Sequence, residues 1–192
     1  MPVCSIMSTT LISLNNVTKY DVKNVYNIEI DRGEFIILKG HNGSGKTTLM
    51  RLILGFIKPD KGSINVLCHR IAYLPEHATL PLFMKSYEYV HIFEKMKRVE
   101  IDTTLLHLFD IPLFRYIFQL SKGNKQKLAI ITTLMGHADL LMLDEPLSGL
   151  DDDSITLLVN YLGKLKQKGC TCIVSSHHNH AFKPIQTREI HL

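Results

Sequence analysis

The sequence predicts an α/β fold built around a mostly parallel sheet. Three short runs of mostly apolar residues have the composition of strands buried on both faces, and they lie at 35–38, 140–143 and 171–175. Segments with helical spacing alternate with them, most clearly from Ile155 to Leu165. Strands that alternate with helices usually pair in parallel and place ligands at their carboxyl ends.

Two other parts of the chain depart from this pattern. Residues 11–17 and 25–30 alternate in part between apolar and polar side chains, which predicts an antiparallel subdomain at the edge of the fold. Residues from about 84 to 136 have only loose helical periodicity, and we interpret them as an inserted helical subdomain. Short strands are also predicted at 64–67 and 71–74, with at most one more over 187–192. We interpret residues 1–192 as a single domain.

Length and composition favour an ordinary domain in a reducing compartment. The chain has 192 residues, enough to bury a sizeable core, and its cysteines (Cys4, Cys68, Cys170 and Cys172) show no paired framework. The C-x-C at 170–172 lacks the spacing of a C-x-x-C redox or zinc motif. No window approaches the roughly eighteen apolar residues of a membrane helix, and residues 1–10 lack the features of a secretory signal. We expect any membrane role to require a partner.

The basic residues predict solvated helix faces rather than a nucleic-acid surface. The formal net charge is +4, and the lysines are spread over 95–98, 122–127 and 164–168. Aromatic residues that would stack on bases are not interleaved with them. We therefore expect no nucleic-acid partner.

A phosphate-binding loop is predicted between the first buried strand and the helix that follows it. The spacing fits G-x-x-x-x-G-K-[ST], a loop whose backbone N–H groups and helix N-terminus bind phosphates. Lys46 is expected to reach the β and γ phosphates, and Thr47 is expected to offer its hydroxyl to Mg²⁺. This makes the core that of a P-loop NTPase. The residues expected at the nucleotide are Gly40, His41, Asn42, Gly43, Ser44, Gly45, Lys46, Thr47 and Thr48.

A second buried strand ends in two carboxylates, Asp144 and Glu145. Asp144 is expected to hold Mg²⁺ through water and Thr47. Glu145 is expected to orient or deprotonate the water that attacks the γ phosphate. The alternatives are a turn cap for Asp144 and a structural role for Glu145.

The order of these segments resembles the nucleotide-binding domain of ATP-binding cassette (ABC) proteins over nearly the whole chain. Leu120-Ser121-Lys122-Gly123-Asn124 stands where the family signature LSGGQ belongs, about twenty residues before the aspartate-glutamate strand. Residues 148–151 correspond to the D-loop, and 175–177 to the switch-histidine segment. The phosphate loop alone leaves GTPases and kinases open, whereas the signature belongs to this family.

The resemblance implies roles for further residues. Tyr20 falls where the family stacks an aromatic ring on adenine, and the less favoured alternative is a core tyrosine of an edge strand. Glu76 falls at the Q-loop, where the family usually has a glutamine that contacts Mg²⁺ and the attacking water. Glutamate there resembles exporter-type ATPases. His177 would bind the γ phosphate and link Glu145 to the opposite subunit, and a metal site formed by the neighbouring histidines is less favoured.

The resemblance also implies a dimer. Ser121 and Gly123 would bind the nucleotide of a second subunit, so that two domains sandwich two ATP molecules head to tail. Lys122 and Asn124 depart from the usual signature, which leaves an altered γ-phosphate affinity open. The second cassette is a copy of this chain or a different one.

The predicted function is the ATP-hydrolysing subunit of an exporter-type ABC transporter, with ATP and Mg²⁺ as cofactors. Its membrane-spanning subunits would be separate chains, and the cassette would lie in the cytoplasm on the inner face of the membrane. The run from Leu80 to Met84 either receives a helix of that partner or belongs to the core. The alternatives are a soluble ABC-type mechanical ATPase that acts on ribosomes or DNA, and a nucleotide sensor without turnover.

Overall fold

The parallel sheet is the centre of the structure. The computed structural model describes residues 9–20, 25–100, 105–106, 109–177 and 179–192. Five parallel strands have the order β5-β6-β7-β3-β8, which confirms the predicted α/β fold. Their bounds are β5 Ile71–Leu74, β6 Leu140–Asp144, β7 Thr171–Ser175, β3 Phe35–Lys39 and β8 Arg188–His191.

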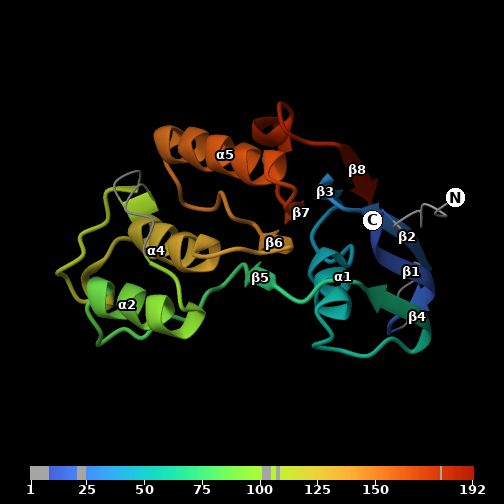
Figure 1. Cartoon of the computed structure of the whole chain (residues 1–192), viewed down its shortest axis with the longest axis horizontal. Coiled ribbons are helices and arrows are strands. Elements are labelled where there is room, and N and C mark those ends of the chain that lie inside the picture. The colour runs from blue at the N-terminus through green and yellow to red at the C-terminus, as the bar shows by residue number, and fades with distance from the viewer. Residues whose placement is uncertain (1–8, 21–24, 101–104, 107–108, 178) are drawn as a thin grey trace, which may run out of the picture.

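The predicted antiparallel subdomain is a three-stranded sheet with the order β2-β1-β4. Its strands are β1 (Thr10–Thr18), β2 (Tyr26–Asp31) and β4 (Lys61–Val66). Figure 1 shows this sheet on the right, with α1 (Lys46–Ile53) between it and the parallel strands. Apolar residues of α1, of the antiparallel sheet and of one face of the parallel sheet form one hydrophobic cluster.

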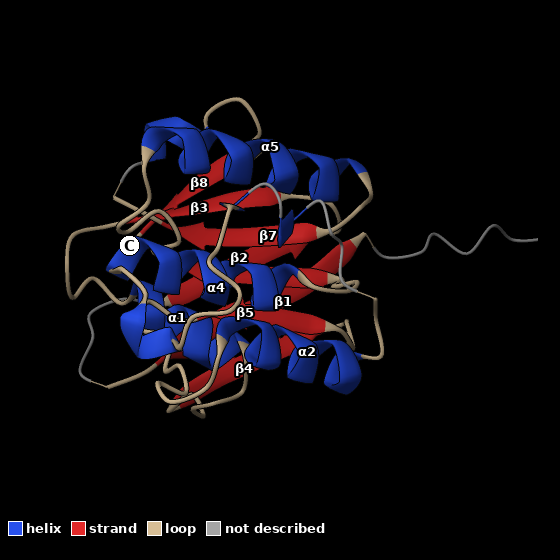
Figure 2. Cartoon of the chain, turned by 90° about the vertical axis from the view of Figure 1, so that its left-hand side faces the viewer, coloured by secondary structure: helices blue, strands red, loops and turns tan. Residues whose placement is uncertain are grey.

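Helices cover the opposite face of the parallel sheet. They are α4 (Lys122–Leu134) and α5 (Asp152–Gln167), and Figure 2 shows both in front of the strands. Phe35 and Ile37 of β3 face this side, whereas Ile36 and Leu38 face α1. Both faces of β3 are therefore buried, which explains why all of its residues from 35 to 38 are apolar.

Helix α2 (Ser86–Lys97) packs on α4 at the left of Figure 1. The Lys97 ammonium donates to the carbonyl oxygens of Thr132, Thr133 and Met135, at 2.8, 3.0 and 3.0 Å. These carbonyls lie at the end of α4, where backbone acceptors lack helical partners and attract a cation. Burial lowers the pKa of this ammonium. Lys97 therefore joins the two helices.

Within the described residues, no helix is both long enough and apolar enough to cross a membrane. Cys68, Cys170 and Cys172 carry free thiols, and Cys4 lies outside the described residues. The absence of a disulfide among the described cysteines agrees with a fold stabilised by its core.

Candidate functional site

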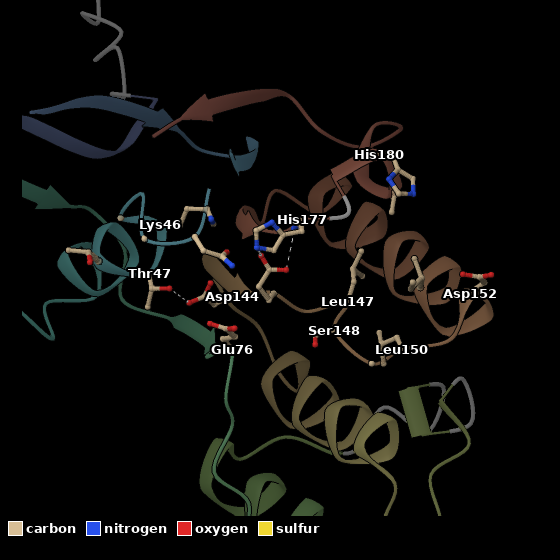
Figure 3. Close-up of a pocket in the computed structure, with 18 residues that line it drawn as sticks. Lys46, Thr47, Glu76, Asp144, Leu147, Ser148, Leu150, Asp152, His177 and His180 are labelled. Atoms are coloured by element: carbon tan, nitrogen blue, oxygen red, sulfur yellow. Dashed lines mark hydrogen bonds and ion pairs between the residues drawn. The ribbon is translucent and has the colours of Figure 1, made fainter. Parts of the chain in front are cut away.

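A cavity of 790 Å³ lies at the carboxyl ends of the parallel strands. It brings together residues from the loop after β3, from the end of β6 and from the segments that follow β5 and β7 (Figure 3). The residues predicted for the nucleotide site that line it are Asn42, Gly43, Gly45, Lys46, Thr47, Thr48, Glu76, Asp144, Glu145 and His177.

The loop after β3 depends on its glycines. Gly43 and Gly45 have φ values of 82° and 103°, a region that side chains with a Cβ rarely adopt. A Cβ on Gly45 would lie 2.6 Å from the Tyr26 hydroxyl oxygen, and a Cβ on Gly40 would collide with the Ser44 hydroxyl. The backbone thus turns tightly into α1, whose N-cap residue is Gly45.

Lys46 is a buried cation at the start of α1. Its ammonium donates to the carbonyl oxygens of Gly40 and His41, at 2.7 and 3.1 Å, and the residue is 9% exposed. The first turn of α1 contains no acidic residue. The ammonium and the positive end of the helix therefore act together, and they favour an anion in the cavity.

Asp144 connects the loop to the two central strands. Its carboxylate accepts a hydrogen bond from the Thr47 hydroxyl at 2.7 Å and another from the Ser175 hydroxyl. The residue is 2% exposed. Sequence reasoning missed the role of Ser175, although a serine at the end of the neighbouring buried strand is a usable signal. Each carboxylate oxygen of Asp144 therefore accepts one hydrogen bond, which fixes the orientation of the carboxylate at the edge of the cavity.

Glu145 and His177 follow the ends of β6 and β7 and contact each other, and Figure 3 shows His177 beside the cavity. The Glu145 N–H donates to the Ser175 carbonyl at 3.0 Å, and the residue has a φ of 49°. The His177 N–H donates to Oε2 of Glu145 at 3.2 Å. The imidazole Nε2 lies 3.5 Å from Oε1 of the same carboxylate. The Glu145 carboxylate is therefore held by two contacts to His177, one from its backbone and one from its ring.

Several predicted site residues do not line this cavity: Tyr20, Gly40, His41, Ser44, Ser121 and Gly123. Tyr20 is 63% exposed, so it is not the core tyrosine that the sequence left open. Its N–H donates to Asp60 at 2.7 Å, and the Lys19 ammonium lies 5.0 Å from its ring centroid. The ring is therefore accessible to a ligand but separate from the cavity.

Ser121 and Gly123 lie at the N-terminus of α4. The Ser121 hydroxyl accepts from the Asn124 N–H at 3.1 Å, so Ser121 caps the helix. A Cβ on Gly123 would lie 2.7 Å from the carbonyl oxygen of Gly149, a residue of the cavity wall. The start of α4 thus packs against residue 149 of the cavity wall, while Ser121 and Gly123 themselves do not line the cavity.

The alternative metal site of neighbouring histidines finds no support in the part of the chain that the structure describes. No group of three or more histidine, cysteine, aspartate or glutamate side chains has metal-binding geometry among those residues. His178, one of the histidines considered, lies outside them. His180 lines the cavity together with His177.

Asp151 caps α5 just beyond the cavity wall. It accepts from the Ser154 N–H at 2.8 Å and from the Lys127 ammonium at 3.0 Å. Hydrogen bonds from the Ser154 side chain and backbone, followed by the one from Lys127, hold the pKa of this carboxyl well below its usual range. The charged carboxylate therefore ties α5 to α4.

We expect the Asp151→Asn variant to lose stability in a pH-dependent way. Asparagine keeps an oxygen that caps α5 but removes the charge that attracts Lys127. Because the pair is exposed, the loss at pH 7 should be at most about 1 kcal/mol. The folded pKa lies below the unfolded value of about 3.9, so the wild-type advantage should be complete above that value and shrink as the pH falls below it. Urea unfolding at pH 7, 5, 3 and 2 measures this difference, which should be equal at the first two pH values and smaller at the last two. A difference that does not change with pH would contradict the charge-based explanation.

Comparisons with known proteins agree with this arrangement. The family model described as ABC transporter matches residues 23–148. An uncharacterised ABC transporter ATP-binding protein of Methanocaldococcus jannaschii is 36% identical over 178 residues, which cover 86% of this chain and 68% of that protein. A second uncharacterised ABC transporter ATP-binding protein, from Bacillus subtilis, is 32% identical over 187 residues. The match covers 87% of this chain but only 63% of that protein.

Two further matches come from a transport protein and a solved structure. A zinc import ATP-binding protein of Yersinia pestis is 31% identical over 189 residues, covering 91% of this chain and 72% of that protein. The solved structure of an ATP-binding subunit of an ABC transporter superposes with a TM-score of 0.85 at 25% identity, covering 95% of this chain and 86% of that one.

Proposed function

This chain belongs to the ABC transporter family as an ATP-binding cassette, and on that premise we propose that its 790 Å³ cavity binds ATP with Mg²⁺ and hydrolyses it. The observation that carries this proposal is the meeting of the glycine loop, Asp144 and Glu145 in one cavity. A buried cation faces the phosphates on one side, and two carboxylates face the metal and the attacking water on the other.

Thr47 and Asp144 suit a magnesium ion. Mg²⁺ prefers hard oxygen ligands and usually takes one or two of them from the protein. The Thr47 hydroxyl and the Asp144 carboxylate lie 2.7 Å apart and line the cavity. When bound, the ion neutralises charge that develops on the phosphate oxygens. Glu76 also lines the cavity, and it would help to hold the ion together with Thr47 and Asp144.

Glu145 is the general base of the proposed reaction. Its carboxylate takes a proton from the water that attacks the γ phosphate, and its contacts to His177 fix the direction in which it points. The imidazole side chain is 51% exposed and lines the cavity, where it would meet the γ phosphate. Lys46 offers a donor to the same phosphate.

The signature segment would act on a second molecule. The capped N-terminus of α4 has no acidic residue in its first turn, and Ser121 does not line its own cavity. A second cassette placed head to tail would bring this helix end to the γ phosphate. We therefore propose a dimer in the ATP-bound state, formed with a copy of this chain or with a different cassette.

An exposed aromatic surface would bind the membrane-spanning subunits. We define this aromatic surface as Phe83, Tyr87, Phe114, Tyr116 and Phe118, which are 87%, 41%, 80%, 41% and 51% exposed. Two hydrogen-bonded segments carry it, since the Ile117 and Phe118 N–H groups donate to the carbonyl oxygens of Met84 and Leu82, at 2.9 and 3.0 Å. Contiguous apolar surface of this kind marks an interaction site.

We propose that the partner is a metal import system on the membrane, and that the cassette lies on its cytoplasmic face. The Yersinia pestis relative, which is named for zinc import, supports this direction. The exporter-type resemblance drawn from the residues around Glu76 is not supported by that relative. One carboxylate at the Q-loop is a weak indicator of direction, because it reports on the metal site and not on the partner.

Hydrolysis of ATP by the purified chain tests the proposed activity. We expect phosphate release with MgATP and at least a tenfold lower rate when EDTA removes Mg²⁺, because the phosphate charge is then neutralised by Lys46 alone. Replacing Asp144 with asparagine should raise the Mg²⁺ concentration needed for half-maximal rate. A rate unaffected by EDTA would contradict the assignment of Thr47 and Asp144.

The Phe83→Ser/Phe118→Ser double variant tests the aromatic surface. We expect it to bind ATP like the wild type but to appear in the soluble fraction of its native cells rather than with the membranes, because it loses two exposed rings of the docking surface. The matched control is Val25→Ser, a 55% exposed apolar residue next to the antiparallel sheet. Membrane fractionation with immunoblotting measures the distribution. If the wild type, the double variant and Val25→Ser were retained equally in the membrane fraction, the partner would have to bind a different surface of the cassette.

A further inference from the structure

Two cysteines at the start of β7 lie far from the nucleotide cavity, at the opposite ends of the parallel strands. Cys172 is fully buried within β7, and Cys170, 8% exposed, precedes it. Cys170 lines a separate cavity of 220 Å³, where the amino ends of β5, β6 and β7 meet the ends of α4 and α5. Arg32, Arg70 and Lys168 also line this cavity. Asp139, which pairs with Arg70 at 2.7 Å, lines it as well. The cavity is therefore basic on balance, and Cys170 is the cysteine of the pair that borders it.

The two thiols share one face of the sheet. Residues two positions apart on a strand point to the same side, and both cysteines belong to the hydrophobic cluster beneath α4 and α5. The Cys172 Sγ lies 3.9 Å from the Cys170 carbonyl oxygen, which directs it back toward its neighbour. The Cys170 Sγ lies 3.6 Å from the carbonyl oxygen of Thr171, the residue between the two cysteines. Both thiols therefore lie beside the same short stretch of backbone, and a local movement at the start of β7 would bring the two sulfurs together.

The pair is asymmetric. The hydrogen bond from the Cys172 thiol lowers the pKa of Cys170 against the opposing effects of burial and Asp139. The same contact and burial raise the pKa of Cys172. The thiolate is the nucleophile in exchange with disulfides. The accessible cysteine is thus the attacking one, and the buried cysteine is suited to resolve the product.

We propose that Cys170 and Cys172 form a redox-active pair that anionic small-molecule disulfides oxidise. The Cys170 thiolate attacks one sulfur of the disulfide RSSR, and RS⁻ leaves as a mixed disulfide forms on Cys170. Cys172, on losing its proton, attacks the Cys170 sulfur and releases the second RS⁻. The protein loses two protons and two electrons, and RSSR takes them up to become two RSH. The C-x-C spacing thus serves as a redox motif, contrary to the expectation from sequence.

Geometry makes such a disulfide reversible. Two residues of extended chain span about 7 Å between Cα atoms, whereas a disulfide prefers about 5.5–6 Å. The start of β7 must therefore contract, and a strained disulfide is readily reduced. The other end of β7 carries Ser175, which donates to Asp144 and accepts from the Glu145 N–H. This link rests on the proposed function, and it predicts at least a threefold lower ATP turnover in the oxidised protein.

The test uses a Cys4→Ser/Cys68→Ser background, in which Cys170 and Cys172 are the remaining cysteines. The probe is the dianionic disulfide 5,5′-dithiobis(2-nitrobenzoate), added to the folded protein. We expect two thionitrobenzoate ions to be released per chain, an intact mass lower by two hydrogens, and full reversal by dithiothreitol. A stable mixed disulfide on Cys170, or reaction only after urea is added, would overturn the proposal. The mass measurement does not depend on ATPase activity.

Single variants assign the two roles. In the same background, Cys172→Ser should stop at the mixed disulfide, and Cys170→Ser should react at least tenfold more slowly. The matched control is Cys170→Ser/Cys172→Ser with Cys68 restored, a partly buried single thiol whose pKa burial raises. If that thiol reacts as fast as the pair, the asymmetry claimed for Cys170 is wrong. A disulfide that forms without lowering ATP turnover would refute the link through Ser175 and leave the redox pair intact.

Discussion

Replacing Glu145 with glutamine should lower ATP turnover by about 10²–10⁴-fold, the usual contribution of a general base. Glutamine has nearly the same shape, and its oxygen can still accept from the His177 N–H, which lies 3.2 Å from Oε2 in the wild type. What it lacks is a basic carboxylate. ATP should therefore bind and remain uncleaved, and the ATP-bound dimer should accumulate. Single-turnover phosphate release and size-exclusion chromatography with ATP measure these two effects.

The matched control for this prediction is Glu29→Gln. Glu29 is an exposed residue of β2 whose side chain does not line the cavity. This variant should hydrolyse ATP at the wild-type rate. Normal hydrolysis by Glu145→Gln would show that another group activates the water, and His177 would then be the first candidate to examine.

Replacing Lys46 with methionine should weaken ATP binding by about 10–100-fold, because a hydrogen bond to a charged group contributes roughly 1.5–3 kcal/mol. Lys46 sits at the positive end of α1 and is 9% exposed, so its charge acts on a phosphate with little screening by water. The two carbonyl oxygens that it contacts, those of Gly40 and His41, are neutral groups that a phosphate can replace as partners. Methionine fills a similar volume without the charge.

Equilibrium binding of ATP by calorimetry measures the Lys46→Met effect. Lys58→Met is the control, because Lys58 is exposed and lies outside the cavity. The control should bind like the wild type. An unchanged dissociation constant for Lys46→Met would mean that the glycine loop does not receive the phosphates, and the whole assignment of the 790 Å³ cavity would have to be abandoned.

The sequence predicts best those features that local spacing determines. The apolar run at 35–38 indicates a strand because its residues alternate between two buried faces, Phe35 and Ile37 on one side and Ile36 and Leu38 on the other. The glycine loop is also local, since its turn and its lysine lie within eight residues. Both therefore follow from composition and order alone.

Long-range contacts decide the features that sequence reasoning missed. Ser175 and Asp144 are 31 residues apart, and only the pairing of β6 with β7 brings them together. Strand β4 begins at Lys61, three residues before the predicted strand, because Lys61 and Ser63 pair with β1 on either side of Gly62, whose φ of 84° marks an irregularity in the pairing. In sequence this glycine reads as part of a turn, and its pairing partner overrides that preference.

The hydrogen bonds from Lys97 to three carbonyl oxygens make α2 and α4 one rigid unit. Helix α4 has 13 residues and is about 20 Å long. The Lys97 ammonium joins its C-terminal end to α2, and Val90 of α2 packs in the same hydrophobic cluster as Leu128 of α4. Phe118 lies in a short 3₁₀ helix, Ile117–Gln119, which directly precedes the Ser121 cap of α4. A force applied to Phe118 would therefore be transmitted to the N-terminus of α4. Lys97 at the C-terminal end of α4 opposes rotation of α4 relative to α2. A force applied by a bound partner would therefore tilt the two helices together.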